Sequence, residues 1–263
     1  MVGRHEVLLH DEQWKRIKPF IPERKRSSKV GQPSADDRAC LEGILWVFRS
    51  GARWRELSDR YPSPSTCWRR LAEWEGEEVL LRSWHALLDR LDEQGLLDRD
   101  EVFVYACFSL AKKRTTESVK RREEKVESGW CWRIVIEFHS HSGPKSLRLP
   151  MLRCPKKSST KSPLAEYPLA EAPTPRVTDR GCDSLKLRTD LLATAWDLVC
   201  SHRLGRVRSK IQDRCKLMRY RRRVKSECTI AWIRSYRRPI IRHEYYRFIY
   251  QGFIHLACMM ICL

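Results

Sequence analysis

Two carboxylates in the C-terminal half of the chain occupy positions from which they could bind divalent metal ions. Asp179 ends a short stretch of strand-forming residues, TPRVTDRG, and is followed by a glycine turn. Glu227 lies within LMRYRRRVKSECTIAWIRSYRR, a run that predicts one long helix from about residue 216 to residue 236. Phosphoryl transfer on DNA needs carboxylates that converge on divalent metals. Asp179 and Glu227 are therefore the candidate catalytic and metal-binding residues.

The predicted long helix would carry further polar side chains on the face of Glu227. Tyr220, Arg223, Glu227 and Arg234 follow one another at intervals of three, four and seven residues, which places them on one face of a continuous α-helix. Arginine side chains on that face suit contacts with phosphate. A solvated basic helix with an internal Arg–Glu pair would give the same pattern, and both interpretations stay open.

The elements that must position these carboxylates belong to an α/β domain. Stretches of strand-forming residues cover residues 101–110, 132–138 and 196–200, and TPRVTDRG adds a strand end. Helical patterns cover 184–195, 216–236 and roughly 245–262. Strands followed by helices in this order predict a layer of helices on a mixed β-sheet over residues 97–263.

The first 96 residues predict a separate helical domain. A helix begins at Asp11, and a second runs from a cap at Asp36 to Gly51. The segment WRELSDRYPSPSTCWRRLAEWE then predicts a short helix, a Pro/Ser turn and a further helix that opens near Ser65. Helix, tight turn and helix are typical of a helix-turn-helix DNA reader.

The helix that opens near Ser65 would present two arginines to DNA. Trp68, Leu71 and Trp74 have the spacing of a buried face, which predicts that Arg69 and Arg70 point outward as DNA-binding residues. The alternative is a plain helical bundle with a charged face. The charge of the chain favours the DNA reader.

Composition indicates a partner that carries negative charge. Lys and Arg number 52 against 33 Asp and Glu, which gives a formal net charge of +19. Such a surplus favours nucleic acid, because neutralised phosphates release their counterions. Hydrophobic residues make up 42% of the chain, enough for a folded core.

The cysteines and the chain ends indicate a cytoplasmic protein. The 11 cysteines contain no C-x-x-C pair, which favours free thiols over a zinc site or a disulfide framework. The first residues lack the apolar core of a secretory signal, and GFIHLACMMICL is too short to span a bilayer. We therefore expect no membrane partner and a buried C-terminal helix.

The spacing Tyr-x2-Arg-x3-Glu-x6-Arg from Tyr220 to Arg234 resembles the signature of bacterial DDE insertion-sequence transposases of the insertion sequence four/five superfamily. DEQWKRIKPFIP, GILWVFRSGARWRELSDRYPSPSTCWRRLAEW and TDRGCDS are similar to the matching segments of such proteins. The resemblance runs from about residue 8 to the C-terminus and is weakest between residues 115 and 175.

The resemblance implies a function and a fold for each part of the chain. It implies a DNA-end-binding domain over residues 1–96 and an RNase H-like catalytic domain over 97–263 that uses Mg²⁺. It also implies double-stranded DNA at element ends and targets as the partner, a homo-oligomer on paired ends, and a place at the nucleoid. Asp179 matches the second catalytic Asp, and Glu227 matches the catalytic Glu.

The chain departs from the family at the first catalytic Asp. In YACFSLAKK that position is occupied by Tyr105. Asp100 points to the opposite strand face, and Glu101 lies roughly 13 Å back along the strand. Glu137, on the next predicted strand, is a possible substitute.

Three interpretations follow from this departure. The first is a DNA-binding transposase, degenerate at its site, in which metal-dependent strand cleavage and transfer are impaired. The second is a non-catalytic DNA-binding regulator or inhibitor derived from a transposase. The third is an active nuclease in which Glu137 completes the metal site.

Overall fold

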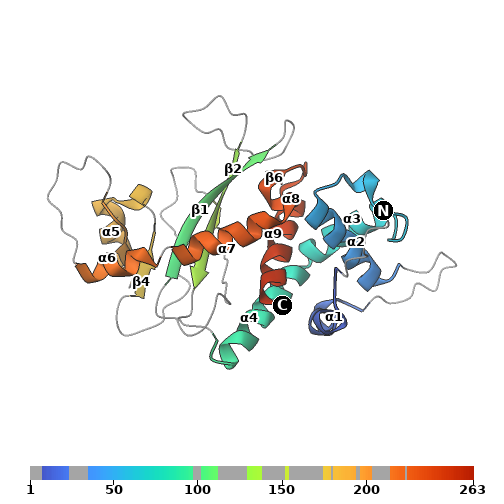
Figure 1. The fold of residues 1–263 in the computed structure, drawn as a ribbon, viewed down its shortest axis with the longest axis horizontal. Coiled ribbons are helices and arrows are strands. Elements are labelled where there is room, and N and C mark those ends of the chain that lie inside the picture. Colours follow the sequence, from blue (N-terminus) through green and yellow to red (C-terminus); the bar gives the residue numbers. More distant parts are fainter. Residues whose placement is uncertain are drawn as a thin grey trace, which may run out of the picture. The chain divides into compact units, whose positions relative to one another are not determined.

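The computed structural model describes residues 8–23, 35–96, 102–111, 129–137, 152–153, 174–178, 180–193, 196–202, 214–222 and 224–263. They form two compact units (Figure 1). The first unit contains the described residues of Met1–Leu87, Ser109–Trp130 and Ile233–Leu263, and the second contains those of Leu88–Phe108 and Cys131–Trp232. This division differs from the predicted boundary after residue 96, because the C-terminal segment packs with the N-terminal helices.

The first unit is built mainly of helices. Its N-terminal elements are α1 (Asp11–Ile17), the 3₁₀ helix η1 (Lys18–Phe20), α2 (Asp37–Ser50), the 3₁₀ helix η2 (Trp54–Glu56), α3 (Pro64–Gly76) and the start of α4 (Val79–Glu93). Its C-terminal elements are α8 (Arg237–Ile240), the short strand β6 (Ile241–Arg242) and α9 (Arg247–Cys262). The short helix predicted before the Pro/Ser turn is therefore a single 3₁₀ turn.

The ends of α2 follow from two residues that the sequence identifies. The Asp36 side chain accepts a hydrogen bond from the Ala39 backbone N–H at 2.9 Å, which satisfies a donor of the first turn. Gly51 ends the helix with a φ of 71°, a left-handed conformation that favours glycine. The predicted bounds of this helix are confirmed.

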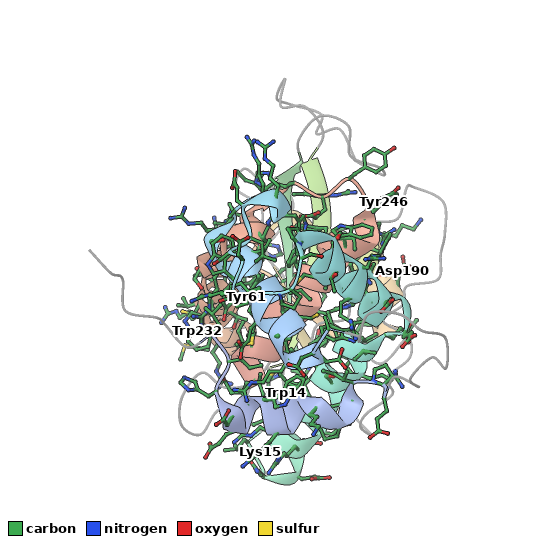
Figure 2. All side chains as sticks on the ribbon, turned by 90° about the vertical axis from the view of Figure 1, so that its right-hand side faces the viewer. Trp14, Lys15, Tyr61, Asp190, Trp232 and Tyr246 are labelled. Atoms are coloured by element: carbon green, nitrogen blue, oxygen red, sulfur yellow. The ribbon has the colours of Figure 1, made fainter. Side chains whose placement is uncertain are left out.

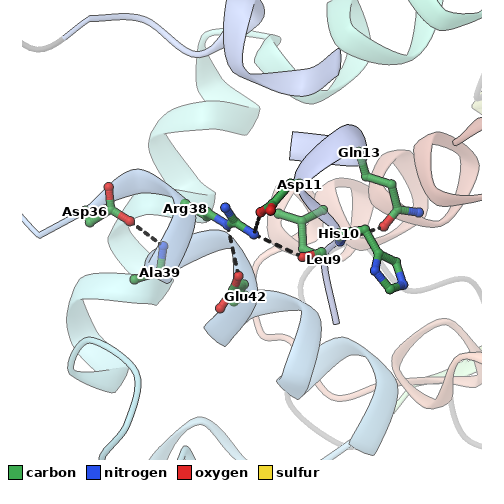
Figure 3. Close-up of polar contacts among 8 residues, drawn as sticks. All are labelled: Leu9, His10, Asp11, Gln13, Asp36, Arg38, Ala39 and Glu42. Atoms are coloured by element: carbon green, nitrogen blue, oxygen red, sulfur yellow. Dashed lines mark hydrogen bonds and ion pairs between the residues drawn. The ribbon is translucent and has the colours of Figure 1, made fainter. Parts of the chain in front are cut away.

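An arginine ties α1 to α2 (Figure 3). Arg38 of α2 lies 2.6 Å from the Asp11 carboxylate and 3.2 Å from that of Glu42. The same guanidinium donates to the Leu9 carbonyl at 3.3 Å. These groups are half-buried or exposed, so their main effect is to fix the entry of the chain into α1.

Helix α9 supplies much of the core of the first unit. Its buried residues include Ile249, Tyr250, Phe253, Ile254 and Leu256. The Phe253 ring stacks on Phe48 of α2 at a centroid distance of 6.1 Å. On the α3 side, His255 Nδ1 lies 3.0 Å from the buried Glu75 carboxylate, 180 positions earlier in the chain. The prediction of a buried C-terminal helix is confirmed, and no described helix has the length and apolarity to cross a membrane.

Most of the second unit is a mixed β-sheet with helices. The strands are β1 (Val102–Ala111), β2 (Gly129–Glu137), β3 (Leu152–Arg153), β4 (Thr174–Val177) and β5 (Trp196–Val199). Among the described residues their order is β3-β2-β1-β4-β5, and β6 pairs with the last residues of β1. β4 is parallel to both β1 and β5, whereas β2 and β3 are antiparallel. The helices are η4 (Arg180–Cys182), α5 (Leu185–Leu192), α6 (Arg214–Arg221) and much of α7 (Val224–Ser235).

The prediction of one continuous helix from about residue 216 to residue 236 is wrong. α6 ends at Arg221, where the Arg222 backbone N–H donates to the Arg219 carbonyl three residues back, and α7 begins at Val224. A run of arginines falls at this break, and like charges within one turn destabilise a helix. Tyr220 and Glu227 therefore lie on different helices, and the predicted single face does not form.

Candidate nucleic-acid interface

The exposed side of α3 begins with a well-capped first turn. Ser63 caps the helix, its Oγ accepting from the Thr66 N–H at 3.3 Å, and Pro64 occupies the first helical position. Arg69 is exposed on this helix, and its Nε donates to the Ser65 carbonyl at 3.2 Å. The predicted outward orientation of Arg69 is confirmed.

Arg70 does not point outward, and this prediction is wrong. Its side chain is 3% exposed, donates to the Asp37 carboxylate, and donates to the Ala35 carbonyl at 3.2 Å. Position 70 falls between the buried positions Cys67 and Trp74, so it faces α2. Burial of the guanidinium is possible because the carboxylate and the carbonyl satisfy its donors. Arg70 is a structural residue of the helical core.

Three further exposed arginines precede α3, and we call Arg53, Arg55 and Arg60 the turn arginines. Arg53 flanks η2, where its backbone N–H donates to the Glu56 carboxylate at 3.0 Å. The guanidinium carbon of Arg60 lies 4.5 Å from the centroid of the Tyr61 ring, which Figure 2 labels. Burial raises the pKa of the Tyr61 phenol, so this side chain remains a neutral donor at neutral pH. Together with Arg69 these cations could contact a phosphate backbone.

Sequence reasoning missed the turn arginines, although WRELSDRY contains all but the first of them. They attract little notice in the sequence because Glu56 and Asp59 lie between them. Both acids are also exposed. The local charge is therefore mixed, and the positive character depends on how the side chains are distributed in space.

A buried ion pair in the first unit fixes the backbone just before η2 in the sequence. Arg238 of α8 lies 2.6 Å from the Glu244 carboxylate, and it also donates to the Ala52 carbonyl. Burial raises the pKa of Glu244 and lowers that of Arg238, and each partner opposes the shift of the other. The pair thus links the C-terminal segment to the residue before Arg53. No sequence pattern pointed to this link, because Arg238 lies 186 positions from Ala52.

Two residues of the predicted carboxylate site, Asp179 and Arg223, lie outside the described residues. Glu227 is exposed in the first turn of α7, and Arg234 is exposed in its last turn. Tyr220 is half-buried on α6. Of these residues, α7 therefore brings Glu227 and Arg234 into one helix.

The remaining predicted positions lie on strands. Tyr105 is within β1, and Glu137 is the last residue of β2. Thr178 follows β4, is buried, and donates its N–H to the Val199 carbonyl of β5 at 2.9 Å. Within the part of the chain that the structure describes, no group of three or more His, Cys, Asp or Glu side chains could hold a metal ion.

Comparison with known proteins locates the family in the helical part of the chain. Residues 9–84 match the family described as "Putative transposase of IS4/5 family (DUF4096)". This segment is therefore similar to that transposase family. It contains α1, α2 and α3 and ends within α4, so the turn arginines and Arg69 are part of the family segment.

Two curated relatives match this transposase-like chain over part of its length. It is 37% identical over 95 residues to "Insertion element IS402 uncharacterized 16.2 kDa protein" of Burkholderia cepacia, covering 35% of this chain and 65% of the relative. It is 36% identical over 66 residues to "Uncharacterized protein y4sN" of Sinorhizobium fredii (strain NBRC 101917 / NGR234), covering 25% of this chain and 51% of that protein. The chain thus spans just under two thirds and about half of the lengths of these relatives. No solved structure matches the chain.

Proposed function

We propose that this protein is a DNA-binding transposase of the DDE class whose strand cleavage and transfer are impaired at the first carboxylate. The observation that carries the proposal is the match of residues 9–84 to a transposase family of insertion sequences four and five. The net charge of +19 supports a partner as strongly anionic as DNA. The family resemblance adds a homo-oligomer assembled on paired DNA ends at the nucleoid.

The N-terminal helices are the proposed DNA-end reader. Arg69 on α3 and the turn arginines provide exposed cations on two neighbouring elements, in the manner of a helix-turn-helix protein. Phosphate contacts of this kind position a protein on the duplex and make its affinity depend on salt. Arg70 is excluded from the set by its burial.

An RNase H-like domain over residues 97–263 is the proposed catalytic scaffold. The strand order β3-β2-β1-β4-β5, with parallel pairing from β1 to β5, supports it. In the β1–β4 ladder, Phe103 pairs with Val177. Tyr105 and Asp179 each follow that pair by two residues along the chain, which supports the assignment of these two positions to one site.

The donor set does not fit a complete magnesium site. Mg²⁺ prefers carboxylate and water oxygens in octahedral geometry. Asp179 and Glu227 would supply two carboxylates, whereas Tyr105 places a phenol at the third position. This mismatch is the reason to propose impaired rather than full activity.

The same mismatch favours a second candidate, a non-catalytic DNA-binding regulator or inhibitor derived from a transposase. Such a protein would keep the reader over residues 1–96 and would occupy DNA ends without cutting them. Both candidates predict DNA binding, and they differ in residual cleavage.

Binding and cleavage are tested with the purified protein and a labelled duplex taken from the DNA that flanks its gene. We expect salt-dependent binding and, with Mg²⁺ or Mn²⁺, cleavage that is weak or absent. Weak cleavage supports the transposase, and binding without any cleavage supports the regulator. Lack of binding at low salt would overturn both, and vigorous cleavage would favour a site completed by Glu137.

Restoring the missing carboxylate is the direct test of the catalytic proposal. Tyr105→Asp should raise metal-dependent cleavage by about a thousandfold, since a lost ligand costs about 4 kcal/mol of combined metal affinity and transition-state stabilisation. The measurement is the cleavage rate of the labelled duplex. Tyr105→Phe is the matched control and should leave the rate unchanged. If the double variant Tyr105→Asp, Glu227→Gln cleaves as well as the single variant Tyr105→Asp, the assigned site is wrong.

A further inference from the structure

A cluster of aromatic side chains lies on the surface of the first unit next to α3. We call Trp68, Tyr245, Tyr246 and Phe248 the aromatic cluster. Tyr246 lies 6.3 Å from Trp68, 5.0 Å from Tyr245 and 5.6 Å from Phe248, measured between ring centroids. Tyr245, Tyr246 and Phe248 are 55%, 48% and 40% exposed, and Tyr246 lies near the periphery of the view in Figure 2. Three large rings in contact with solvent and with one another are unusual unless they bind something.

The charge around the cluster is positive. In the sequence RHEYYRF, basic residues precede the two tyrosines and separate them from the phenylalanine. Glu244 is the sole acid of this segment, and it is buried and paired with Arg238 at 2.6 Å. His243 is exposed and Arg247 is half-buried, while Arg69 follows Trp68 on α3. The rings therefore project from a segment whose only acidic carboxylate is buried and whose more exposed side chains include basic groups.

The backbone beneath the rings is held from inside the unit. The buried Arg242 donates through Nε to the Glu244 carbonyl at 3.1 Å and through Nη2 to the Tyr245 carbonyl at 2.9 Å. Helix α9 begins directly after Tyr246, and Tyr250 in its first turns donates its hydroxyl to the Pro239 carbonyl at 2.9 Å. The exposed rings thus lie on a segment whose backbone is already fixed, so little conformational entropy is lost when a flat ligand stacks on them.

We propose that the aromatic cluster is a stacking platform for unpaired bases of single-stranded DNA. Bases stack on aromatic rings without sequence preference, and neighbouring cations bind the backbone. A second copy of this chain is a poorer occupant, because it would bring like charge to the same face. This inference rests on the proposed DNA-binding function. It adds a second DNA ligand, unpaired nucleotides, beside the duplex proposed to bind Arg69 and the turn arginines.

The test compares three DNA ligands by fluorescence anisotropy with the full chain. The first is a blunt duplex, the second carries a short single-stranded tail, and the third carries an abasic tail of equal length and charge. We expect the base-bearing tail to bind about tenfold more tightly than the abasic tail. Equal affinity for the two tails would overturn the proposal, because charge alone would then explain binding. Absence of binding to the blunt duplex would instead refute the proposed DNA-binding function.

Variants assign the effect to the cluster. Tyr246→Ala and Phe248→Ala should each lose most of the preference for the base-bearing tail and keep blunt-duplex affinity. Trp232→Ala, which removes an exposed aromatic of α7, is the matched control and should keep the preference. Retention of the preference in both cluster variants would overturn the assignment. The assignment would also be overturned if the cluster variants changed from dimer to monomer in sedimentation without any change in tail binding. That result would identify a second copy of the chain as the occupant of the cluster.

Discussion

Arg69 and Arg70 are neighbours in the chain, but their side chains meet different environments. Arg69 is exposed, whereas Arg70 is buried against the Asp37 carboxylate. Arg69→Ala should leave the free energy of unfolding within about 0.5 kcal/mol and lower the salt dependence of DNA binding by about one phosphate contact. Arg70→Leu should lower the free energy of unfolding by about 3 kcal/mol, because it leaves a partly buried carboxylate without its partner.

Urea unfolding and salt-dependent anisotropy measure these two quantities in each variant. Each substitution is the control for the other, since Arg69→Ala should change DNA binding and not stability, whereas Arg70→Leu should change stability. A loss of DNA affinity in well-folded Arg70→Leu equal to that in Arg69→Ala would contradict the assignment of Arg70 to the core.

The cysteines provide a second prediction at the residue scale. Seven cysteines are free thiols in the structure, namely Cys40, Cys67, Cys182, Cys200, Cys228, Cys258 and Cys262. Burial raises the pKa of Cys262 to about 12 and that of Cys258 well above its ordinary value, whereas Cys228 is exposed. A thiol with a raised pKa stays protonated below that pKa and is therefore a poor nucleophile at pH 8.

Brief alkylation with iodoacetamide at pH 8 should therefore modify Cys228 before Cys258 and Cys262. Mass spectrometry of the peptides measures the order. Denatured protein is the control, in which all three should react alike. Native Cys262 reacting as fast as Cys228 would show that α9 does not protect its last turn.

At the scale of elements, the end of α2 depends on Gly51. Its φ of 71° is unfavourable for other residues, and an added Cβ would lie 2.8 Å from the Cβ of Arg237. Gly51→Ala should lower the free energy of unfolding by about 2 kcal/mol, from backbone strain and the displacement of α8. Gly76→Ala is the control, because a Cβ there meets nothing within 4 Å. Thermal unfolding measures both, and equal stability of the two variants would contradict the contact between α2 and α8.

The break between α6 and α7 shows what periodicity misses at this scale. Strands β1, β2 and β5 and helices α2, α5 and α9 fall within a few residues of their predicted places, because alternation and helical spacing mark them locally. The pattern from Tyr220 to Arg234 is equally regular. This spacing contains no information about the repulsion among clustered arginines, and the helix is interrupted between α6 and α7.

At the scale of the whole molecule, the N-terminal helices do not form a unit by themselves. α9 buries Ile249, Phe253 and Leu256 in the core of the first unit, and each such side chain contributes about 2 kcal/mol on burial. A fragment of residues 1–96 should therefore lack a cooperative thermal transition, since whole domains are stable by only about 5–15 kcal/mol.

Circular dichroism of the fragment tests this expectation, with the full chain as the control. Addition of a peptide of residues 233–263 should restore a cooperative transition. A fragment that unfolds cooperatively without the peptide would show that the predicted boundary after residue 96 is a true domain boundary.

The candidate site divides in the same way between what is local and what is not. The tyrosine at position 105, the basic charge and the similarity of residues 9–84 to a transposase family are properties of the chain order, and the sequence determined them. The N-cap at Asp36 and the glycine end at Gly51 are equally local, since each depends on one side chain and its nearest backbone. The sheet order, the burial of Arg70 and the union of α9 with α3 were decided by the tertiary structure. Each depends on which segments, distant in the sequence, bury their apolar surfaces against one another, and short-range sequence patterns do not contain that information.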